Sequence, residues 1–314
     1  MKGAGLNLLE NRMANELNLN VDEAAVNEDA AGRRRTAASF QGERGAFSED
    51  AARALIGPAV QTIACRTFEE MFEAVSSGNA DCAVAPIENS LAGSVHKNYD
   101  LLEEHDLTII GETKVRIVHN LIALPGVPLS EVRRVYSHPV ALAQCERFIR
   151  GNPQIEFEEA YDTAGSVKMI VDNNRRDEAA IAGASAATVY GGEIIAEGIE
   201  DNPKNFTRFL LLCRPENAGK VSILAIGGVR KTSIVFRVGN KPGALFRALA
   251  VFALRDIDLC KIESRPIEGR PWEYSFYLDL TGDQTEPAIE RALGHLAEMA
   301  ESVRVLGSYI RSEE

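Results

Sequence analysis

The sequence predicts an α/β protein with two structural units, and three observations support this. The chain has 314 residues, which is long for one compact domain. From residue 36 to about 215, short apolar runs alternate with amphipathic stretches of helical length, a pattern that indicates a largely parallel sheet covered by helices. From residue 231 to 312 the expected order is strand, helix, strand, strand, helix, strand, which is the ferredoxin-like arrangement.

In the first unit, apolar runs predict the strands and the amphipathic stretches between them predict the helices. The runs lie at residues 37–40, 60–65, 82–87, 107–110, 121–124, 132–137, 155–160, 179–182 and 209–213. The helices are expected at residues 48–55, 68–76, 141–150, 164–172 and 184–190. In such a sheet, ligands bind outside the carboxyl ends of the strands, where loops lead into helix N-termini.

A linker rich in glycine and polar residues, 216–230, precedes the second unit. Alternation predicts strands at 231–238, 259–267, 273–280 and 303–309, with helices at 242–254 and 286–301. A unit of this size is small, so we expect its sheet to pair with that of a second copy. Residues 1–35 are polar and rich in Asn, Glu and Ala, and we interpret them as a weakly ordered extension.

Charge and cysteine usage narrow the class of protein. The net charge of −12 argues against a nucleic-acid partner, because binding phosphates requires a clustered basic surface. The five cysteines are odd in number and form no CxxC, which is typical of a reducing compartment. No apolar segment reaches the ~20 residues of a membrane helix. The acids within residues 1–35 argue against a transit peptide, so a cytoplasmic location is expected.

Thr207 and Arg208 enter a predicted buried strand directly after a loop of turn-forming residues. An arginine can hold a carboxylate with two parallel hydrogen bonds, and a threonine hydroxyl can donate a proton or hydrogen bond to a leaving group. The two side chains face opposite ways if the strand begins at Phe206, so only local twist could bring both to one ligand. The alternative is a strand edge with an exposed arginine.

Polar side chains also follow another buried strand, where Glu88, Asn89 and Ser90 place an acid, an amide and a hydroxyl in succession. Loops at such positions bind ligands disproportionately often. The alternative is that Ser90 or Ser94 merely caps the next helix.

Two further loops could bind an anion at a helix N-terminus. Residues 40–48 place two glycines before a helix, and residues 161–166 offer Asp162 or Thr163 as an N-cap. For residues 40–48 a glycine turn followed by an N-cap, with no ligand, is the favoured interpretation, and for residues 161–166 capping alone explains the pattern equally well. His138 also follows a strand, but as a lone histidine it is interpreted as structural. The sequence has no metal-ligand cluster, GxGxxG motif, P-loop or nucleophile elbow, so a site without metal or cofactor is expected.

In their order along the chain these motifs resemble those of the prephenate dehydratase and arogenate dehydratase family. The resemblance covers about residues 36–310. Its motifs in the first unit are Gln41-Gly42-x-x-Gly45, Pro86-Ile87-Glu88-Asn89-Ser90-x-x-Gly93-Ser94, Asp162-Thr163-Ala164 and Asn205-x-Thr207-Arg208-Phe209. In the second unit, Gly243-Ala244-Leu245 and Glu263-Ser264-Arg265-Pro266 are similar to the two signatures of the family's regulatory ACT domain.

The resemblance implies a two-lobed catalytic domain, residues 36–215, similar to periplasmic binding proteins. It implies conversion of prephenate to phenylpyruvate with loss of water and carbon dioxide, in phenylalanine biosynthesis. By analogy, Thr207 is the proton donor to the leaving hydroxyl, and Arg208 pairs with a substrate carboxylate or orders the loop. The residues implied to contact the substrate are Gln41, Gly42, Glu88, Asn89, Ser90, Gly93, Thr163, Ala164, Asn205 and Phe209.

For the ACT domain, residues 231–312, the resemblance implies feedback inhibition by phenylalanine bound between subunits of a homodimer or homotetramer. Loop amides at a helix N-terminus can take the carboxylate of the amino acid. The residues implied to bind it are Asn240, Pro242, Gly243, Ala244, Leu245, Glu263, Ser264 and Arg265. The alternative is a dimerisation module without a ligand.

The choice of substrate stays open at this point. Residues 96–102 are closer to the form in plant-type arogenate dehydratases than to many bacterial sequences. Arogenate carries an ammonium where prephenate carries a keto group, so one acidic or carbonyl partner could change the preference. Prephenate is the expected substrate. The alternatives are an arogenate dehydratase and a non-catalytic amino-acid-binding protein.

Overall fold

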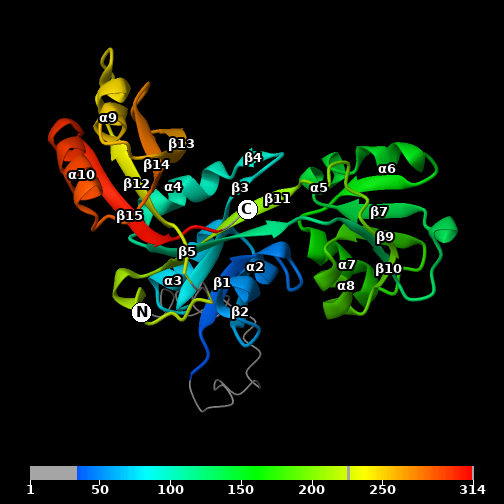
Figure 1. The fold of residues 1–314 in the computed structure, drawn as a ribbon. Helices are drawn as coiled ribbons and strands as arrows, with labels where there is room; N and C mark the ends of the chain where they lie inside the picture. The colour runs from blue at the N-terminus through cyan, green and yellow to red at the C-terminus, as the bar shows by residue number, and fades with distance from the viewer. Residues whose placement is uncertain (1–33, 225–226, 313–314) are drawn as a thin grey trace, which may run out of the picture.

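The computed structural model describes residues 34–224 and 227–312, which form three sheets flanked by helices (Figure 1). Two sheets make the two lobes of the first unit, and the third is the C-terminal unit. The predicted extension lies outside the described residues except for its last two positions. Within the described ranges, no helix is long and apolar enough to cross a membrane.

Lobe 1 is built on a sheet of order β2-β1-β3-β11-β5, with the short β4 paired to β3. Its strands are β1 (Ala37–Gln41), β2 (Gln61–Cys65), β3 (Cys82–Asn89), β4 (Gly93–Ser94), β5 (Thr108–Arg116) and β11 (Phe206–Cys213). Its helices are α2 (Phe47–Ile56), α3 (Phe68–Ser76) and α4 (His96–Glu104). Apolar residues of both sheet faces are buried under these helices, which fixes the strand ends that carry polar side chains.

Lobe 2 is built on a sheet of order β10-β6-β9-β7-β8. Its strands are β6 (Asn120–Ala123), β7 (Arg134–Ser137), β8 (Glu156–Glu159), β9 (Glu178–Ala182) and β10 (Glu193–Ala196). Its helices are η1 (Leu129–Glu131), α5 (Pro139–Ala143), α6 (Glu146–Gly151), α7 (Thr163–Asp172) and α8 (Ala184–Tyr190). The helix predicted at 141–150 is in fact two helices, broken where Gln144 ends α5 and Cys145 begins α6.

Both sheets are mixed, whereas the sequence predicts a largely parallel sheet. The strands β1, β2 and β3 pair in parallel, as do β7, β8 and β9. The remaining principal strands pair antiparallel because the chain crosses between the lobes twice. It leaves lobe 1 after β5 and returns as β11, which lies between β3 and β5 and runs against both.

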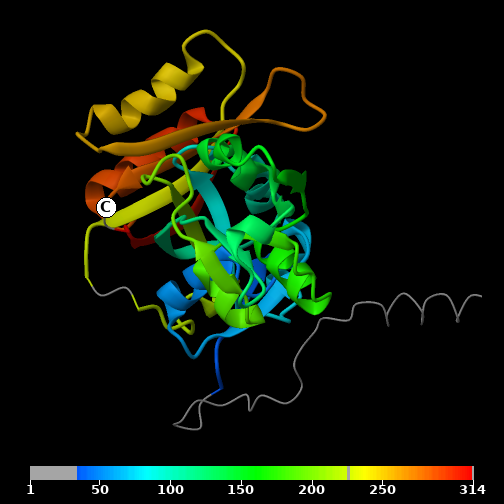
Figure 2. The ribbon, with the colours of Figure 1, turned by 90° about the vertical axis from the view of Figure 1, so that its right-hand side faces the viewer.

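The C-terminal unit has the predicted βαββαβ order. Its elements are β12 (Arg230–Arg237), α9 (Ala244–Ala253), β13 (Leu259–Pro266), β14 (Tyr274–Thr281), α10 (Pro287–Met299) and β15 (Ser302–Ile310), and its sheet order is β13-β14-β12-β15. Helices α9 and α10 cover one face of this sheet. The other face packs against lobe 1, close to α4 and β5 (Figures 1 and 2).

The docking of the C-terminal unit requires close backbone approach. A Cβ atom on Gly307 of β15 would overlap the backbone of Ile109 in β5. Tyr277 and Tyr309 from the third sheet join the apolar cluster of lobe 1, and the Tyr277 hydroxyl donates to the Tyr99 carbonyl at 2.6 Å. The two units therefore share a core in this structure.

Candidate active site

A cleft of about 570 Å³ is lined by residues of both lobes. Lobe 1 contributes the ends of β1 and β3 and the starts of β11 and α2, and lobe 2 contributes the starts of α5 and α7. The polar side chains in the lining are Gln41, Ser48, Asn89, Ser94, His119, His138, Gln144, Tyr161, Asp162, Thr163 and Thr207. No lysine or arginine of the described residues belongs to this lining, so the cleft is mostly neutral.

The loop between β1 and α2 holds the two lobes together at one end of the cleft. The backbone N–H of Glu43 donates to the Asp162 carboxylate at 3.3 Å, and the Ser185 hydroxyl donates to Asp50 at 2.7 Å. Gly45, with φ +81°, lies so close to lobe 2 that a Cβ atom would be 2.7 Å from the Ala186 Cα. This loop therefore needs glycine both for its conformation and for lobe contact.

Asn89 at the end of β3 holds the Thr207 hydroxyl. The Asn89 Oδ1 accepts from the backbone N–H groups of Leu91 and Ala92 at 3.0 and 2.8 Å, which fixes the orientation of its amide. The Nδ2 of the same amide therefore donates to Thr207 Oγ1, at 2.9 Å. Because Oγ1 is the acceptor in this bond, the hydroxyl proton of Thr207 is free to point into the cleft. That proton has no acceptor among residues 34–224 and 227–312.

A chain of side-chain hydrogen bonds continues from Asn89 into lobe 2. Asn89 Nδ2 also donates to Asn205 Oδ1 at 2.8 Å, and Asn205 Nδ2 donates to Gln144 Oε1 at 2.8 Å. The same Gln144 oxygen lies 2.9 Å from His119 Nε2, so that nitrogen carries the proton. Asn205 is fully buried, and so its amide is a fixed link between Thr207 and lobe 2.

His119 is the buried end of this chain. Burial lowers the pKa of its imidazole, and the Gln144 hydrogen bond only partly opposes this shift. The ring packs edge-on against Phe47 at a centroid distance of 5.9 Å. The neutral imidazole that results suits a donor to an amide oxygen.

Two helices begin at the cleft. The N-cap of α2 is Ala46, which has no polar side chain, and the N–H groups of Phe47 and Ser48 have no acceptor in the described part of the chain. At α7 the N-cap Asp162 accepts from the Gly165 N–H at 2.7 Å. Burial raises the pKa of Asp162, although the N–H groups of Gly165 and Glu43 counteract part of the shift. The cleft thus offers a free helix N-terminus to an anion and one carboxyl group.

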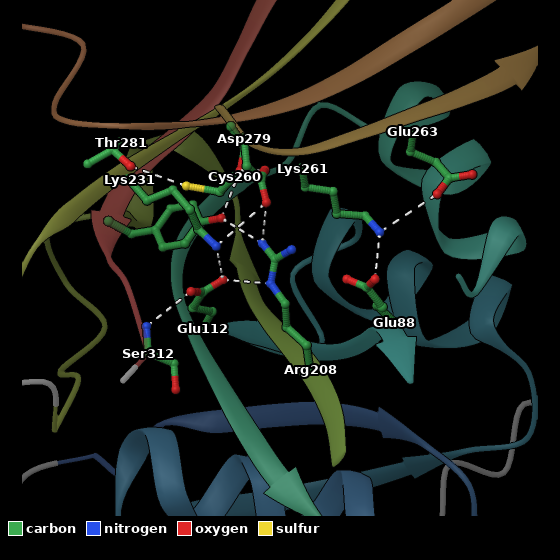
Figure 3. Close-up of polar contacts among 12 residues, drawn as sticks. Glu88, Glu112, Arg208, Lys231, Cys260, Lys261, Glu263, Asp279, Thr281 and Ser312 are labelled. Atoms are coloured by element: carbon green, nitrogen blue, oxygen red, sulfur yellow. Dashed lines mark hydrogen bonds and ion pairs between the residues drawn. The ribbon is translucent and has the colours of Figure 1, made fainter. Parts of the chain in front are cut away.

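Arg208 does not line the cleft, whereas one of its two predicted roles was to pair with a substrate carboxylate. It lies on the opposite face of β11, where its guanidinium pairs with Glu112 and with Asp279 of the C-terminal unit, each at 2.7 Å (Figure 3). Glu88 likewise faces away from the cleft and pairs with Lys261 at 2.9 Å (Figure 3). The cause is strand alternation, because Thr207 and Asn89 occupy the cleft face.

The other predicted substrate contacts divide into two groups. Gln41, Asn89, Gly93, Thr163, Thr207 and Phe209 line the cleft. Gly42, Ser90, Ala164 and Asn205 are not part of the lining. Ser90 accepts from the Phe206 N–H at 3.0 Å and so fixes the start of β11, while Ala164 is fully buried on the inner face of α7.

The predicted phenylalanine-binding residues are not gathered in one place within a single chain. Asn240, Ala244 and Leu245 line a small hollow of about 100 Å³ beside Trp272, with Pro242 and Gly243 in the same loop. On β13, Glu263 accepts from the Ser94 hydroxyl at 2.5 Å and Arg265 pairs with Asp100 at 2.8 Å, so both face lobe 1. Ser264 is exposed on the opposite face of that strand.

Sequence reasoning missed His119 and Gln144. His119 directly precedes a predicted strand on the crossing between the lobes, and Gln144 was placed within a continuous helix. The polar pair His119-Asn120 before an apolar run is the only signal in the sequence that points to the first. The break in the helix, which depends on lobe packing, leaves no comparable signal for the second.

Comparisons with known proteins agree with this architecture. The family model for prephenate dehydratase matches residues 38–217, and that for the ACT domain matches residues 232–297. The chain is 45% identical over 284 residues to arogenate dehydratase/prephenate dehydratase 2 of Arabidopsis thaliana, covering 88% of this chain and 73% of that protein. It is 44% identical to arogenate dehydratase 2 of Petunia hybrida, covering 86% and 71%.

Solved structures give the same result. A prephenate dehydratase from Arthrobacter aurescens, solved in complex with L-Phe, has a TM-score of 0.79 and 34% identity, covering 88% of this chain and 90% of that chain. GqqA, described as a novel type of quorum quenching acylase, has a TM-score of 0.77 and 35% identity, covering 88% and 98%.

The names of the plant relatives contradict the cytoplasmic location expected from the sequence. Two of the Arabidopsis relatives, at 45% and 44% identity, are named as chloroplastic and so point to the plastid. Cysteine usage reports only that a compartment is reducing. It does not distinguish the cytosol from other reducing compartments.

Proposed function

Because the chain belongs to the prephenate dehydratase family and carries a C-terminal ACT domain, we propose that its cleft converts prephenate to phenylpyruvate. The observation that carries the proposal is the orientation of the Thr207 hydroxyl. Asn89 donates to the Thr207 oxygen at 2.9 Å, which leaves the hydroxyl proton free to be donated to a substrate in the cleft. A donor held in one orientation is what departure of a hydroxyl group requires.

The reaction needs one proton and no redox partner. The bond between the ring and its carboxylate breaks to release carbon dioxide, and the electron pair enters the ring. The bond to the ring hydroxyl breaks at the same time, and the departing oxygen takes a proton from Thr207 and leaves as water. Solvent then restores the Thr207 proton. Aromatisation of the ring supplies the driving force.

The charge of the cleft suits this sequence of events. The ring carboxylate loses its charge as it becomes carbon dioxide, so a strong cation beside it would stabilise the substrate more than the transition state. The lining contains no lysine or arginine among the described residues. The free N–H groups of Phe47 and Ser48 at the start of α2 offer a weaker site for one of the two substrate carboxylates.

Arogenate is the alternative substrate, and Asp162 is the candidate for its recognition. Arogenate differs in carrying an ammonium group on the side chain, and Asp162 is the one carboxyl group in the described lining. Replacing Asp162 with Asn keeps a good N-cap for α7 and removes the charge. If arogenate is used, D162N should lower kcat/KM for arogenate at least ten times more than for prephenate, because a hydrogen bond to a charged group contributes about 1.5–3 kcal/mol.

We also propose that phenylalanine binds between the ACT domains of two copies. The strand β13 is the edge of its sheet, and Ser264 is exposed along it together with Ile262, at 47%. Phe246 of α9 and Leu254, the residue that caps the C-terminus of α9, are exposed at 76% and 82%. An exposed apolar edge of this kind favours pairing with a second sheet. Pairing could bring Ser264 of one copy near the Asn240–Leu245 loop of the other.

Purified protein incubated with prephenate should produce phenylpyruvate, and with arogenate it should produce phenylalanine. Comparing kcat/KM for the two substrates assigns the preference. Added phenylalanine should lower the rate and shift the protein to a closed, paired state by light scattering. If the protein binds prephenate but converts neither substrate, the dehydratase proposal is wrong. The rival hypothesis, a non-catalytic ligand-binding protein, would then stand in its place.

A further inference from the structure

Strands β3 and β11 carry cleft residues on one face and charged residues on the other. Thr207 lies opposite Asn89 in the ladder, and Arg208 lies opposite Glu88. The register shifts immediately afterwards, between Arg208 and Phe209, which marks a β-bulge. Thr207, the candidate proton donor, and Asn89, which holds it, are therefore each joined by one peptide bond to a charged residue on the far face.

The far side of Arg208 is a buried cluster of alternating charges. Arg208 pairs with Glu112 of β5 and Asp279 of β14, and Lys231 of β12 reaches the same two carboxylates at 2.7 and 3.5 Å (Figure 3). The Tyr309 hydroxyl accepts from Arg208 at 3.2 Å. The ACT domain therefore supplies three of the four side chains around Arg208, namely Lys231, Asp279 and Tyr309.

Burial disfavours the charged forms of this cluster, and the partners restore them. For Arg208 the carboxylates of Asp279 and Glu112 outweigh burial, so its pKa stays above the ordinary value. For Asp279, Arg208 and Lys231 hold the pKa below the ordinary value although burial acts to raise it. Buried ion pairs contribute little net stability, because desolvation offsets their attraction. What they do provide is a fixed geometry between the strands that carry them.

Glu88 makes the second ionic contact between the cleft strands and the ACT domain. Its carboxylate pairs with Lys261 of β13 at 2.9 Å, and the Lys261 ammonium is also within 3.7 Å of Glu263 (Figure 3). Glu263 in turn accepts from the hydroxyl of Ser94, which lines the cleft. Both strands that form the candidate catalytic pair are thus tied to the ACT domain at the residue next to the pair.

We propose that Arg208 and Glu88 are positioning residues whose partners, Asp279 and Lys261, come from the ACT domain and fix the Asn89–Thr207 hydrogen bond. The inference rests on the proposed dehydratase function. It gives Arg208 a role through Thr207 rather than through substrate. It also gives the ACT domain a route to the cleft, because a shift of β13 or β14 moves these two strand positions.

The test is a double-mutant cycle on the more accessible pair, with Glu88→Gln, Lys261→Met and the double variant. Each should lower kcat by about ten-fold with KM within about two-fold, because a displacement of about 1 Å at a reacting group can cost up to 100-fold. The double variant should fall no further than either single variant, since all three remove one ion pair. Asp279→Asn should act in the same direction through Arg208.

Asp100→Asn is the matched control. It removes an ion pair of the same kind across the same interface, with Arg265 at 2.8 Å, but Asp100 lies on α4 and not beside a cleft residue. D100N should lower the melting temperature and leave kcat within two-fold. Folded E88Q and K261M with wild-type kcat would overturn the proposal, as would an equal loss in D100N.

The side-chain amide resonance of Asn89 reports the same coupling without turnover. It should shift in E88Q and K261M, shift to the same position in the double variant, and stay unchanged in D100N. An unmoved resonance in E88Q would overturn the positioning role by itself. Wild-type protein that turns over neither prephenate nor arogenate would instead refute the proposed function, whatever this resonance does.

Discussion

Replacing Asn205 with Ala should lower both the stability of the protein and its turnover, and the two effects can be measured independently. The Asn205 side chain is fully buried and makes two hydrogen bonds of 2.8 Å, one from Asn89 and one to Gln144. After the substitution, Gln144 Oε1 keeps its His119 donor, and Asn89 Nδ2 keeps Thr207 Oγ1 at 2.9 Å and the Phe206 carbonyl at 3.3 Å as acceptors. The cost is therefore that of two lost hydrogen bonds, about 1 kcal/mol each. The free energy of unfolding should fall by roughly 2 kcal/mol.

Turnover should fall as well, because the link between Thr207 and lobe 2 is gone. We expect kcat to decrease by about 10- to 100-fold when measured where the variant is fully folded. Urea unfolding gives the stability, and phenylpyruvate formation gives kcat. Asn152→Ala is the control, because Asn152 also makes two side-chain hydrogen bonds but lies at the end of α6, away from the cleft lining. A destabilised N205A with normal kcat would refute the positioning role of the chain.

Three further outcomes follow from the same geometry. Gly45→Ala should raise KM and lower the free energy of unfolding by about 1–2 kcal/mol, since the residue has φ +81° and its Cβ would meet Ala186 of lobe 2. An unchanged KM would show that the contact of this loop with lobe 2 does not affect substrate binding. Burial lowers the pKa of His119 below 6.5, so as the pH falls the unfolded state takes up the proton before the folded state does. The free energy of unfolding should therefore decline below about pH 6.5, by up to about 1.4 kcal/mol per pH unit. His119→Gln should flatten that decline when urea midpoints are compared between pH 7 and 5. Iodoacetamide should modify native protein at the exposed Cys260 alone, because the other four cysteines are buried. Burial also raises the pKa of the Cys65 and Cys145 thiols to about 12 and that of Cys213 to about 11. Mass spectrometry that shows a second modified thiol would contradict this packing.

Periodicity predicted the C-terminal unit well, because each of its strands has one face on a helix layer. Strands expected at 231–238 and 303–309 are β12 and β15 within one or two residues. The direction of β11 could not be predicted in the same way. Its antiparallel place between β3 and β5 depends on the chain returning from lobe 2, which is a property of the tertiary structure and not of the local pattern.

The candidate site was likewise predictable only where it depends on the local sequence pattern. Alternation along a strand correctly indicated that Thr207 and Arg208 face opposite ways unless local twist intervenes. What Arg208 meets could not be predicted, because Asp279 is 71 positions later and reaches it only through docking of the ACT domain. The same holds for Glu263 and Arg265, which carry a family signature but contact Ser94 and Asp100 within one chain.

The most direct measurement is the turnover of Thr207→Val, which keeps the shape of the side chain and removes only the hydroxyl. Asn89 keeps Asn205 as an acceptor, so the fold should be retained with a near-normal melting temperature. A positioned proton donor contributes about 100- to 10,000-fold, so kcat for phenylpyruvate formation should fall by at least about 100-fold. Folded T207V that converts prephenate at close to the wild-type rate would contradict the account.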